Sequence, residues 1–423
     1  MEETKVELIE EEIVIIGAGI AGLSTALGLH RLGLKSLVLE SSDSLRVSGF
    51  ALTLWTNAWR ALDALGVADS LRIKFPQIQG FELASAHAST STPQSVAADC
   101  GLNRPYECRC VERKELLETL AKELPHGTIR FSSKLLSIHH HHQQSTTGFK
   151  SLQLSDGSVI NTKVLIGCDG VNSQVAKWLG LKNPVKSNRS AIRGLLQSPP
   201  DGGGHGLEPR FHVYFGGGVR FGFVPCNNNS LYWFCTFTPS SSTSSSGGKE
   251  EEFEEGEAMK MKQFVLNKAR NAPKEMLEVV ERTGLDAISC SELKLRPPWN
   301  LLTGNIVKDN VCVAGDALHP MTPDIGQGGC SALEDSVILA RCIGEAMMMK
   351  TNDDKLLEKY GKERRWRSFW LISAAYMMGV IQESGGKVTS FIREKVLPGS
   401  TIGALVYMAD FHCGKLTTTE SSS

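Results

Sequence analysis

Three glycines near the N-terminus have the spacing of a site that binds a dinucleotide. Gly17, Gly19 and Gly22 follow one apolar run and open a helical pattern, after which a second apolar run ends at Glu40. In a β-α-β unit these glycines permit a tight turn, close approach of a pyrophosphate and close helix packing, respectively. A carboxylate at the end of the second strand binds ribose hydroxyls and repels a 2′-phosphate, so we expect FAD or NAD rather than NADP as the bound nucleotide.

Two further apolar runs end in an acid beside a glycine. One ends at Asp169-Gly170 and the other at Gly315-Asp316. In an open α/β sheet, ligands bind outside the carboxyl ends of the strands. The three strand ends together therefore predict one long dinucleotide site, with Asp316 placed to hydrogen-bond a hydroxyl of the ligand.

The loop that follows Asp316 combines prolines, which fix its shape, with glycines, which expose backbone amides at the start of a helix. Amides at a helix start suit the polar edge of an isoalloxazine ring and stabilise negative charge on a reduced flavin. The residues at this helix start are Gly326, Gln327, Gly328, Gly329 and Cys330.

Bulk composition excludes several function classes. The 423 residues include 45 Lys and Arg against 46 Asp and Glu, so no global field favours nucleic acid. The 11 cysteines form no Cys-x-x-Cys pair, and the N-terminus lacks a signal pattern, which indicates a reducing compartment. The longest apolar stretch, 370–381, is too short to span a bilayer. We expect a cytoplasmic protein, with a plastid or a peripheral membrane location as alternatives.

The order of apolar runs predicts an α/β fold with two domains. A Rossmann-like FAD-binding domain carries an inserted antiparallel β-sheet substrate domain and is followed by a C-terminal helical segment. The expected boundaries are 1–187 for the first part of the FAD-binding domain, with substrate-side strands near 75–110; 188–290 for the substrate domain; 291–350 for the return to the FAD-binding domain; and 351–423 for C-terminal helices and tail.

Two charged runs have plain structural interpretations. His139 to His142 are consecutive in a predicted strand, so their side chains alternate between faces, and we expect a solvated hairpin tip rather than a metal site. Arg364, Arg365 and Arg367 fall in the C-terminal helical part, where we expect a solvated charged face.

From residue 12 to about 345 the chain resembles the class A flavoprotein monooxygenases of the para-hydroxybenzoate hydroxylase type. The resemblance rests on the first glycine motif, on Asp169-Gly170, and on the long motif GDALHPMTPDIGQGGCSALED at 315–335. Within that family the chain is similar to FAD-dependent urate hydroxylases and to plant monooxygenases related to zeaxanthin epoxidase. The resemblance implies tightly but non-covalently bound FAD, NAD(P)H as a transient reductant, and hydroxylation of a small aromatic or heteroaromatic substrate by O2 through a flavin hydroperoxide.

The resemblance also implies which residues contact the cofactor. They are Gly17, Ala18, Gly19, Ile20, Ala21 and Gly22 at the pyrophosphate; Glu40 and Ser41 at the adenosine ribose; Leu135 at adenine; Arg46, Thr53 and Arg113 along FAD; Asp169 and Gly170 at FAD and the nicotinamide; Gly315 and Asp316 at the ribityl or pyrophosphate region; and Gly326, Gln327, Gly328, Gly329 and Cys330 at the flavin ring.

The expected substrate contacts lie on two paired strands. Arg220 and Tyr232 resemble a substrate-side arginine and tyrosine of the urate hydroxylases, which implies catalytic roles; the alternatives are a salt-bridged arginine and a core tyrosine. Arg193 stands where the urate enzymes have Asn, which argues against urate itself. The Asp169 motif usually continues to an arginine, whereas this chain has Ala176 and Lys177, so its handling of the nicotinamide is open.

Three other functions remain open at the level of sequence. They are an epoxidase acting on an isoprenoid at a membrane surface, an FAD-dependent oxidase or reductase without oxygen insertion, and an FAD-binding sensor without catalysis. We expect a monomer or homodimer whose partners are a small-molecule substrate and O2, with neither nucleic acid nor a transmembrane segment.

Overall fold

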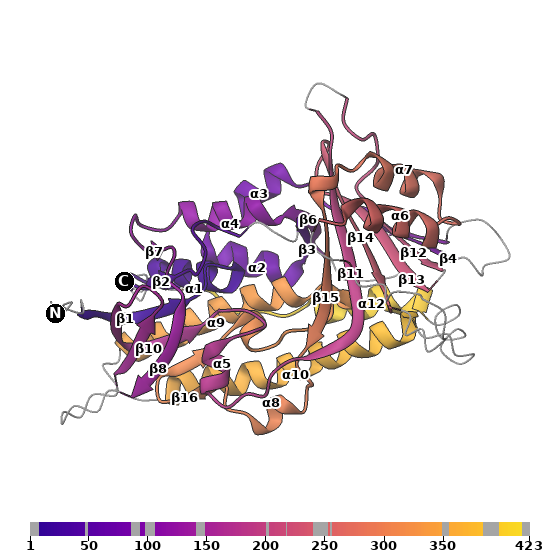
Figure 1. Cartoon of the computed structure of the whole chain (residues 1–423). Coiled ribbons are helices and arrows are strands. Elements are labelled where there is room, and N and C mark those ends of the chain that lie inside the picture. The colour runs from indigo at the N-terminus through magenta and orange to yellow at the C-terminus, as the bar shows by residue number, and fades with distance from the viewer. Residues whose placement is uncertain are drawn as a thin grey trace.

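The computed structural model places two β-sheets side by side, with helices on both (Figure 1). It describes residues 8–46, 50–85, 94–97, 106–140, 149–199, 203–216, 218–239, 253, 256–348, 355–383 and 397–416. The mixed α/β architecture with its C-terminal helices confirms the predicted fold class. His141 and His142 lie outside the described residues.

The first sheet has the parallel core expected of a nucleotide-binding domain. Its path is β16-β17-β10-β1-β2-β7, and β8 and β9 extend it beside β10. β1 lies at the centre and runs parallel to both β2 and β10, so the three carboxyl ends meet at one edge. The strands are β1 (Leu8–Ile16), β2 (Leu37–Leu39), β7 (Ile129–Arg130), β8 (Leu135–His140), β9 (Lys150–Leu154), β10 (Val159–Gly167), β16 (Val307–Lys308) and β17 (Val311–Val313).

Asp156-Gly157 forms a tight turn between β9 and β10. The two strands pair antiparallel, and Gly157 has a φ of 84°, a left-handed conformation that glycine adopts without strain. The Asp156 carboxylate accepts the backbone N–H of Ser158 at 2.9 Å, which closes the turn.

Helices cover this sheet because their apolar faces are buried against it. α1 lies beside α9, and α2 and α10 also pack on α9. The helices of this part are α1 (Ile20–Arg31), α2 (Thr56–Leu65), α3 (Ala68–Lys74), α4 (Arg113–Lys122), α5 (Gln174–Trp178), α8 (Asn300–Thr303) and α9 (Gly328–Met348), with short 3₁₀ turns at Gly315–Ala317 and Pro323–Ile325. A two-stranded sheet, β3 (Ala51–Trp55) with β6 (Cys108–Glu112), joins this layer to the second sheet.

The second sheet is antiparallel apart from one parallel pair, β4 with β12. One of its faces is buried under α6 (Ala258–Lys268) and α7 (Lys274–Arg282), and residues of the other face pack with the core around the first sheet (Figure 1). Its order is β15-β11-β14-β13-β12-β4-β5. The strands are β4 (Gly80–Ser85), β5 (Gln94–Ala97), β11 (Val185–Gln197), β12 (Arg210–Gly216), β13 (Val219–Pro225), β14 (Ser230–Phe237) and β15 (Ile288–Leu295), with a 3₁₀ turn at Leu285–Ala287 before β15.

Two C-terminal helices in the described part of the chain complete the fold. α10 (Lys355–Glu383) packs along α9 and reaches the 3₁₀ turn at Pro323–Ile325, and α12 (Leu397–Met408) follows it. None of the helices in the described part of the chain combines the length and apolarity needed to cross a membrane.

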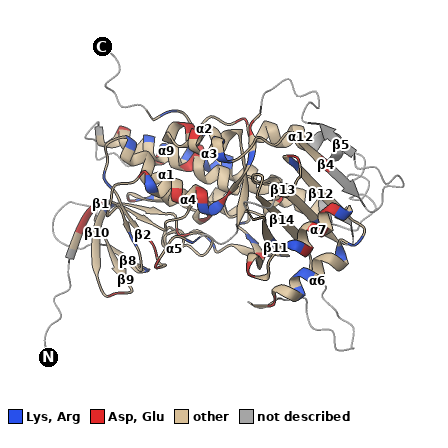
Figure 2. Ribbon diagram, turned by 90° about the horizontal axis from the view of Figure 1, so that it is seen from above, with Lys and Arg blue, Asp and Glu red and all other residues tan. Residues whose placement is uncertain are grey.

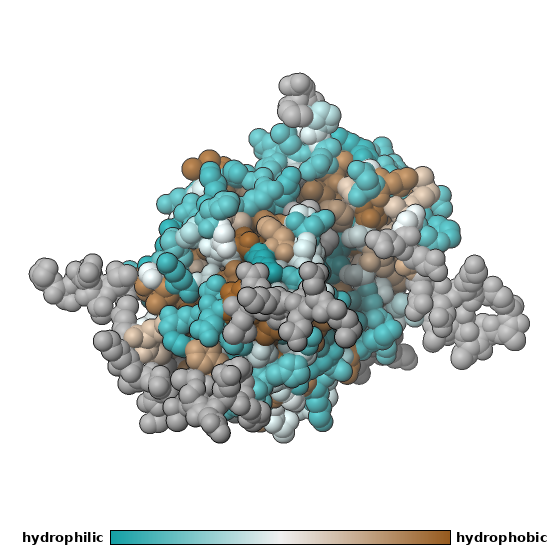
Figure 3. All heavy atoms as spheres, turned by 60° about the vertical axis from the view of Figure 1, so that its left-hand side comes forward, coloured by the Kyte–Doolittle hydropathy of each residue, from teal (hydrophilic) through white to brown (hydrophobic). Residues whose placement is uncertain are grey.

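The surface carries charges of both signs. Basic and acidic residues are intermixed along the helices in the view of Figure 2. The face in Figure 3 is largely hydrophilic, with smaller hydrophobic areas between.

Candidate active site

The glycine motif forms a tight turn that leaves open space at one position. A Cβ on Gly22 would lie 1.8 Å from the Gly17 carbonyl oxygen, and Gly17 itself has a φ of 101°. A Cβ on Gly19, in contrast, would meet no protein atom within 4 Å. Gly19 also precedes α1, whose first amides lack intrahelical partners. The open space at the start of the helix suits a pyrophosphate.

Glu40 is held as an ionised acceptor beside this turn. Its carboxylate accepts the backbone N–H of Ala18 at 2.8 Å and of Ser42 at 2.9 Å, and Arg46 lies 3.3 Å away. Burial alone would raise the pKa of Glu40, but these two N–H groups and Arg46 bring it below the ordinary value. The neighbouring Ser41 is exposed.

The strand that begins at Leu135 approaches the same place through the backbone. Glu40 donates its N–H to the Arg130 carbonyl at 2.9 Å, and Ser133 donates to the Glu40 carbonyl at 2.7 Å. The structure thus brings the segment before Leu135 beside Glu40, although the two are almost 100 positions apart in the sequence.

Arg113 and Asp316 lie close enough to interact electrostatically. Arg113 is the first residue of α4, and its buried Nε has no hydrogen-bond partner in the described part of the chain. The Asp316 side chain is open to solvent, yet desolvation by the surrounding protein raises its pKa, partly offset by His319 and Arg113. A ligand hydroxyl would satisfy this exposed but desolvated carboxylate.

The glycine-rich loop lies against β3. Gly326 has a φ of 61°, and a Cβ there would come within 3.0 Å of the Thr53 Oγ1 and 3.2 Å of the Trp55 Nε1. Cys330 is buried and receives the Trp55 backbone N–H at 3.4 Å. A Cβ on Gly328 would meet only Met321, at 4.0 Å, so the start of α9 faces open space, as a flavin-binding loop requires.

Gln327 differs from the glycines around it because its side chain points into the protein. It is fully buried, and its Oε1 accepts the Asn57 amide at 2.8 Å. The same Asn57 amide reaches a carboxylate oxygen of Glu334 at 2.5 Å. The Gln327 Oε1 is thus occupied, whereas its buried Nε2 has no partner among the described residues.

Asp169 caps a helix. Its carboxylate accepts the Ser173 hydroxyl at 2.5 Å and the Gln174 backbone N–H at 2.7 Å, at the start of α5. Desolvation raises the pKa of Asp169 in spite of these bonds. On the same helix Ala176 is buried and Lys177 is exposed. The roles of Asp169 and Gly170 toward FAD and the nicotinamide stay a prediction.

Arg220 lies in a buried ion cluster with the flavin loop. Asp324, in the 3₁₀ turn before Gly326, receives Arg189 at 2.7 and 3.0 Å and Arg220 at 3.3 Å. Burial alone would raise the pKa of Asp324, but these arginines hold it below the ordinary value. The Arg220 guanidinium also lies 5.0 Å from the Phe234 ring centroid. Arg220 therefore ties β13 to the flavin loop, and direct contact with substrate stays a prediction.

Tyr232 is a protonated phenol on the face of the second sheet that looks toward the first domain. Desolvation raises its pKa to about 12, and the nearby positive charge of Arg193 partly offsets this rise. Its side chain is only half-buried. Beneath it, Cys110 of β6 and Cys226 after β13 approach with their sulfur atoms 3.3 Å apart.

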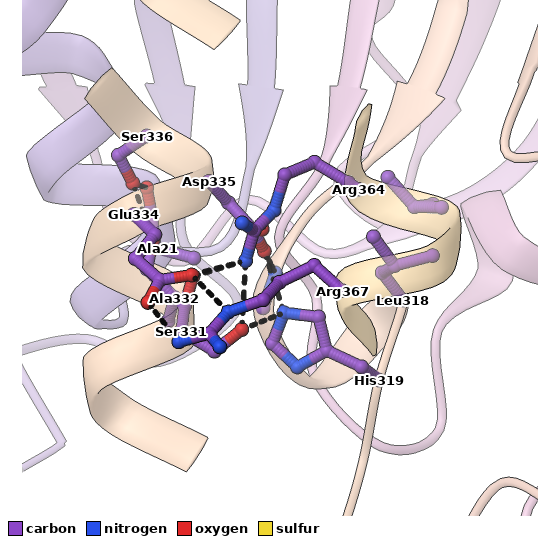
Figure 4. A network of polar contacts seen from close by, with 12 residues as sticks. Ala21, Leu318, His319, Ser331, Ala332, Glu334, Asp335, Ser336, Arg364 and Arg367 are labelled. Atoms are coloured by element: carbon purple, nitrogen blue, oxygen red, sulfur yellow. Dashed lines mark hydrogen bonds and ion pairs between the residues drawn. The ribbon is translucent and has the colours of Figure 1, made fainter. Parts of the chain in front are cut away.

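A buried ion network behind the site is not visible as such in the sequence (Figure 4). Arg364 of α10 is fully buried and donates to Asp335 at 2.5 Å and to Glu334 at 2.8 Å, both on α9. Arg367 adds a bond to Glu334 at 2.7 Å. The expectation of a solvated arginine face was wrong for Arg364, because two buried carboxylates from another helix require its charge.

The network also fixes the strand end that carries Asp316. Asp335 accepts the Gly315 backbone N–H at 2.7 Å and the His319 Nε2 at 2.7 Å. Burial alone would raise the pKa of Asp335, but His319 and Arg364 bring it below the ordinary value. His319 is fully buried, so its role is to hold the loop. The signal in the sequence is the adjacent acid pair Glu334-Asp335 inside a largely apolar helix.

Together these features fit FAD. They supply an open helix start at Gly19, an ionised Glu40 for ribose, an unpaired Arg113 Nε, an accessible Asp316 and a second open helix start at Gly328. Among the described residues, no three His, Cys, Asp or Glu side chains gather into a metal site.

Known proteins are similar to this chain in sequence and fold. The family model described as FAD binding domain matches residues 10–374. Monooxygenase 2 of Arabidopsis thaliana is 48% identical over 419 residues, covering 96% of this chain and 98% of its own. An FAD-dependent urate hydroxylase of Mycolicibacterium vanbaalenii is 25% identical over 335 residues, 78% of each chain.

A solved structure agrees in fold over nearly the whole chain. The crystal structure of Klebsiella pneumoniae HpxO complexed with FAD and uric acid superposes with a TM-score of 0.76 and 20% identity, covering 97% of this chain and 98% of that one. The family match and the plant relative confirm the resemblance seen in the sequence. The chain belongs to the FAD-dependent monooxygenases and is an oxidoreductase.

Proposed function

We propose that the protein hydroxylates a small aromatic or heteroaromatic molecule, with NAD(P)H as reductant and O2 as oxidant. The observation that carries this proposal is a continuous series of aromatic rings between the flavin loop and the second sheet. Trp55 stacks on Phe81 at 5.7 Å between centroids, Phe81 meets Phe211 at 6.0 Å, Phe211 meets Phe234 at 6.1 Å, and Phe234 meets Tyr232 at 6.2 Å. Such a series supports binding of a flat ring by offset or edge contacts.

The residues around this aromatic series bind and orient the cofactor and the substrate, and they exclude water. Bound FAD supplies electron transfer from NAD(P)H and activation of O2. The open start of α9 at Gly328 orients its ring system, and the Arg220–Asp324 pair holds that loop against the second sheet. Tyr232, whose pKa of about 12 keeps it protonated at neutral pH, donates a hydrogen bond to a ring oxygen of the substrate.

The proposal is tested by isotope labelling. The purified flavoprotein is supplied with NADPH or NADH, ¹⁸O2 and a panel of phenols, purines and isoprenoids, and products are analysed by mass spectrometry. A product of an aromatic or heteroaromatic ring that gains one ¹⁸O atom supports the proposal. Oxygen recovered only as peroxide indicates an oxidase, and a labelled epoxide of an isoprenoid indicates the epoxidase; either result overturns it.

We also propose a cytoplasmic enzyme that acts as a monomer or homodimer. Peripheral membrane contact remains the alternative, because one side of α10 exposes large apolar side chains. Trp366, Trp370 and Met377 are 55%, 65% and 61% exposed. Sedimentation with anionic vesicles separates the two: protein that remains in the supernatant supports the cytoplasmic proposal, and protein in the pellet contradicts it. Light scattering gives the oligomeric state.

A further inference from the structure

Arg193 lies on β11, the strand next to the edge strand β15, on the side of the second sheet opposite α6 and α7. It lies between Phe234 of β14 and Ser289 of β15. Its neighbour Ile192 packs into the core formed with α6 and α7. Since side chains alternate along a strand, Arg193 points the opposite way, to the side on which Tyr232 and Phe234 lie.

Among the residues that the structure describes, no carboxylate neutralises the charge of Arg193. Its guanidinium donates to the Ser291 hydroxyl at 2.5 Å and lies close enough to Tyr232 to act on its phenol electrostatically, but in the described part of the chain it forms no ion pair with a carboxylate. Its half-buried side chain also lies close enough to Arg113 to repel that second cation. A partly desolvated guanidinium beside another one is costly unless an anion joins them.

The other two arginines on this side of the sheet do not have this property. Arg189 and Arg220 both pair with Asp324 and are buried with it. Arg193 is thus the substrate-side arginine that is set apart from that ion cluster, and it is also the more accessible one.

We propose that Arg193, together with Tyr232, binds an anionic group of the substrate, either a carboxylate or an ionised ring oxygen, and so makes the enzyme selective for acidic rings. The planar guanidinium matches two oxygens of such a group. Tyr232 lies on the same face of the sheet, and its protonated O–H can donate to the same anion. This inference rests on the proposed hydroxylase function.

The test measures binding to the oxidised holoenzyme, without turnover. Salicylate and its neutral isostere salicylamide are titrated while the flavin difference spectrum is recorded. The wild type is expected to bind salicylate more tightly. In Arg193→Gln the dissociation constant for salicylate should rise about 10- to 100-fold, as for loss of a charged hydrogen-bonded pair, while that for salicylamide changes less than about twofold.

Two variants serve as controls. Arg193→Lys keeps the charge and should lose only part of the preference for salicylate. Arg210→Gln removes an arginine from β12 of the same sheet that pairs with Glu82 and Glu208, and it should leave both constants unchanged. Flavin content and thermal unfolding establish that each variant is folded and loaded with FAD.

The outcomes separate this inference from the proposed function. Equal binding of the charged and neutral probes in the wild type, or equal loss of both in Arg193→Gln, overturns the role of Arg193 even if hydroxylation is found. Loss of flavin from Arg193→Gln also overturns it, because the residue would then serve the cofactor. If neither probe perturbs the flavin but NADPH-dependent hydroxylation of another class occurs, the acidic-ring inference fails and the monooxygenase stands.

Discussion

At the scale of single residues, the glycine motif separates folding from cofactor binding. A side chain on Gly22 collides with the Gly17 carbonyl, whereas a side chain on Gly19 meets only open space. A substitution at Gly22 should therefore disturb the fold, whereas a substitution at Gly19 should disturb ligand binding.

We predict that Gly19→Val folds normally but does not bind FAD. The added side chain fits the protein, because nothing lies within 4 Å of its Cβ, yet it occupies the space of the pyrophosphate. Thermal unfolding of the apoprotein should match the wild type, and flavin absorbance should be lost. Gly22→Ala is the contrasting variant and should fail to fold. A yellow Gly19→Val protein with normal flavin content would refute the motif assignment.

We predict that Asp316→Asn stabilises the apoprotein and weakens FAD binding. A folded-state pKa raised by desolvation means that the charged carboxylate destabilises the folded protein at neutral pH, so its removal is favourable. The same carboxylate is the acceptor that a flavin hydroxyl needs. The expected pair of results is a higher melting temperature of the apoprotein and a larger dissociation constant for FAD. A lower melting temperature would contradict this account.

At the scale of elements, helix α10 supports the flavin loop through a glycine. A Cβ on Gly379 would lie 2.3 Å from the Arg189 Nη1 and 2.7 Å from the Asp324 Oδ2. We predict that Gly379→Ala separates this ion pair and costs roughly 1–3 kcal/mol in the free energy of unfolding, as overpacking of a filled core does. Urea unfolding measures the cost, and Ala374→Ser on the same helix is the control. An unchanged midpoint for Gly379→Ala would show that α10 does not press on the loop.

The contact between α9 and α10 depends on buried charge. We predict that Arg364→Met destabilises the protein by about 3–5 kcal/mol, since it leaves Glu334 and Asp335 buried without their shared cation. Chemical denaturation tests this value. The double variant with Asp335→Asn should recover part of the loss, because one of the unpaired charges is then removed as well. Additive losses in the double variant would mean that the pair is not coupled.

At the scale of the whole molecule, acid should weaken the fold through three buried carboxylates. Asp324, Glu334 and Asp335 all have pKa values below their ordinary ones because arginines surround them. Their contribution is therefore fully present above the unfolded-state pKa values of about 4 and is lost as the pH falls through the lower folded-state values. We expect similar urea midpoints at about pH 7 and pH 5 and a steep loss below about pH 4. A steady decline from neutral pH would point to other groups.

The sequence could predict the elements whose signal is local. The glycine motif, the acid that closes β2, and the Asp156-Gly157 turn depend on short-range backbone requirements, and each is found in the structure. The sequence could also predict that the second sheet is antiparallel, because its segments show the alternating pattern of such strands.

The remainder depends on contacts between distant segments. Arg364 is buried against Glu334, and Arg220 pairs with Asp324. Gly379 packs against the same Asp324. Each of these contacts joins residues from separate elements. From a short stretch of sequence, a charged residue is predicted to be solvated. Only the tertiary structure shows the opposite charge with which it is buried. The same limit applies to substrate contacts, which come from several strands.

The most direct test of the account is a rapid-mixing measurement on the purified protein. Its absorbance spectrum is recorded first, and the flavin band is then followed after anaerobic addition of NADPH or NADH, with and without an aromatic substrate. The account predicts flavin bands that bleach with either nicotinamide, faster when the substrate is bound. A protein without flavin after gentle purification, or a flavin that neither nicotinamide reduces, would contradict it.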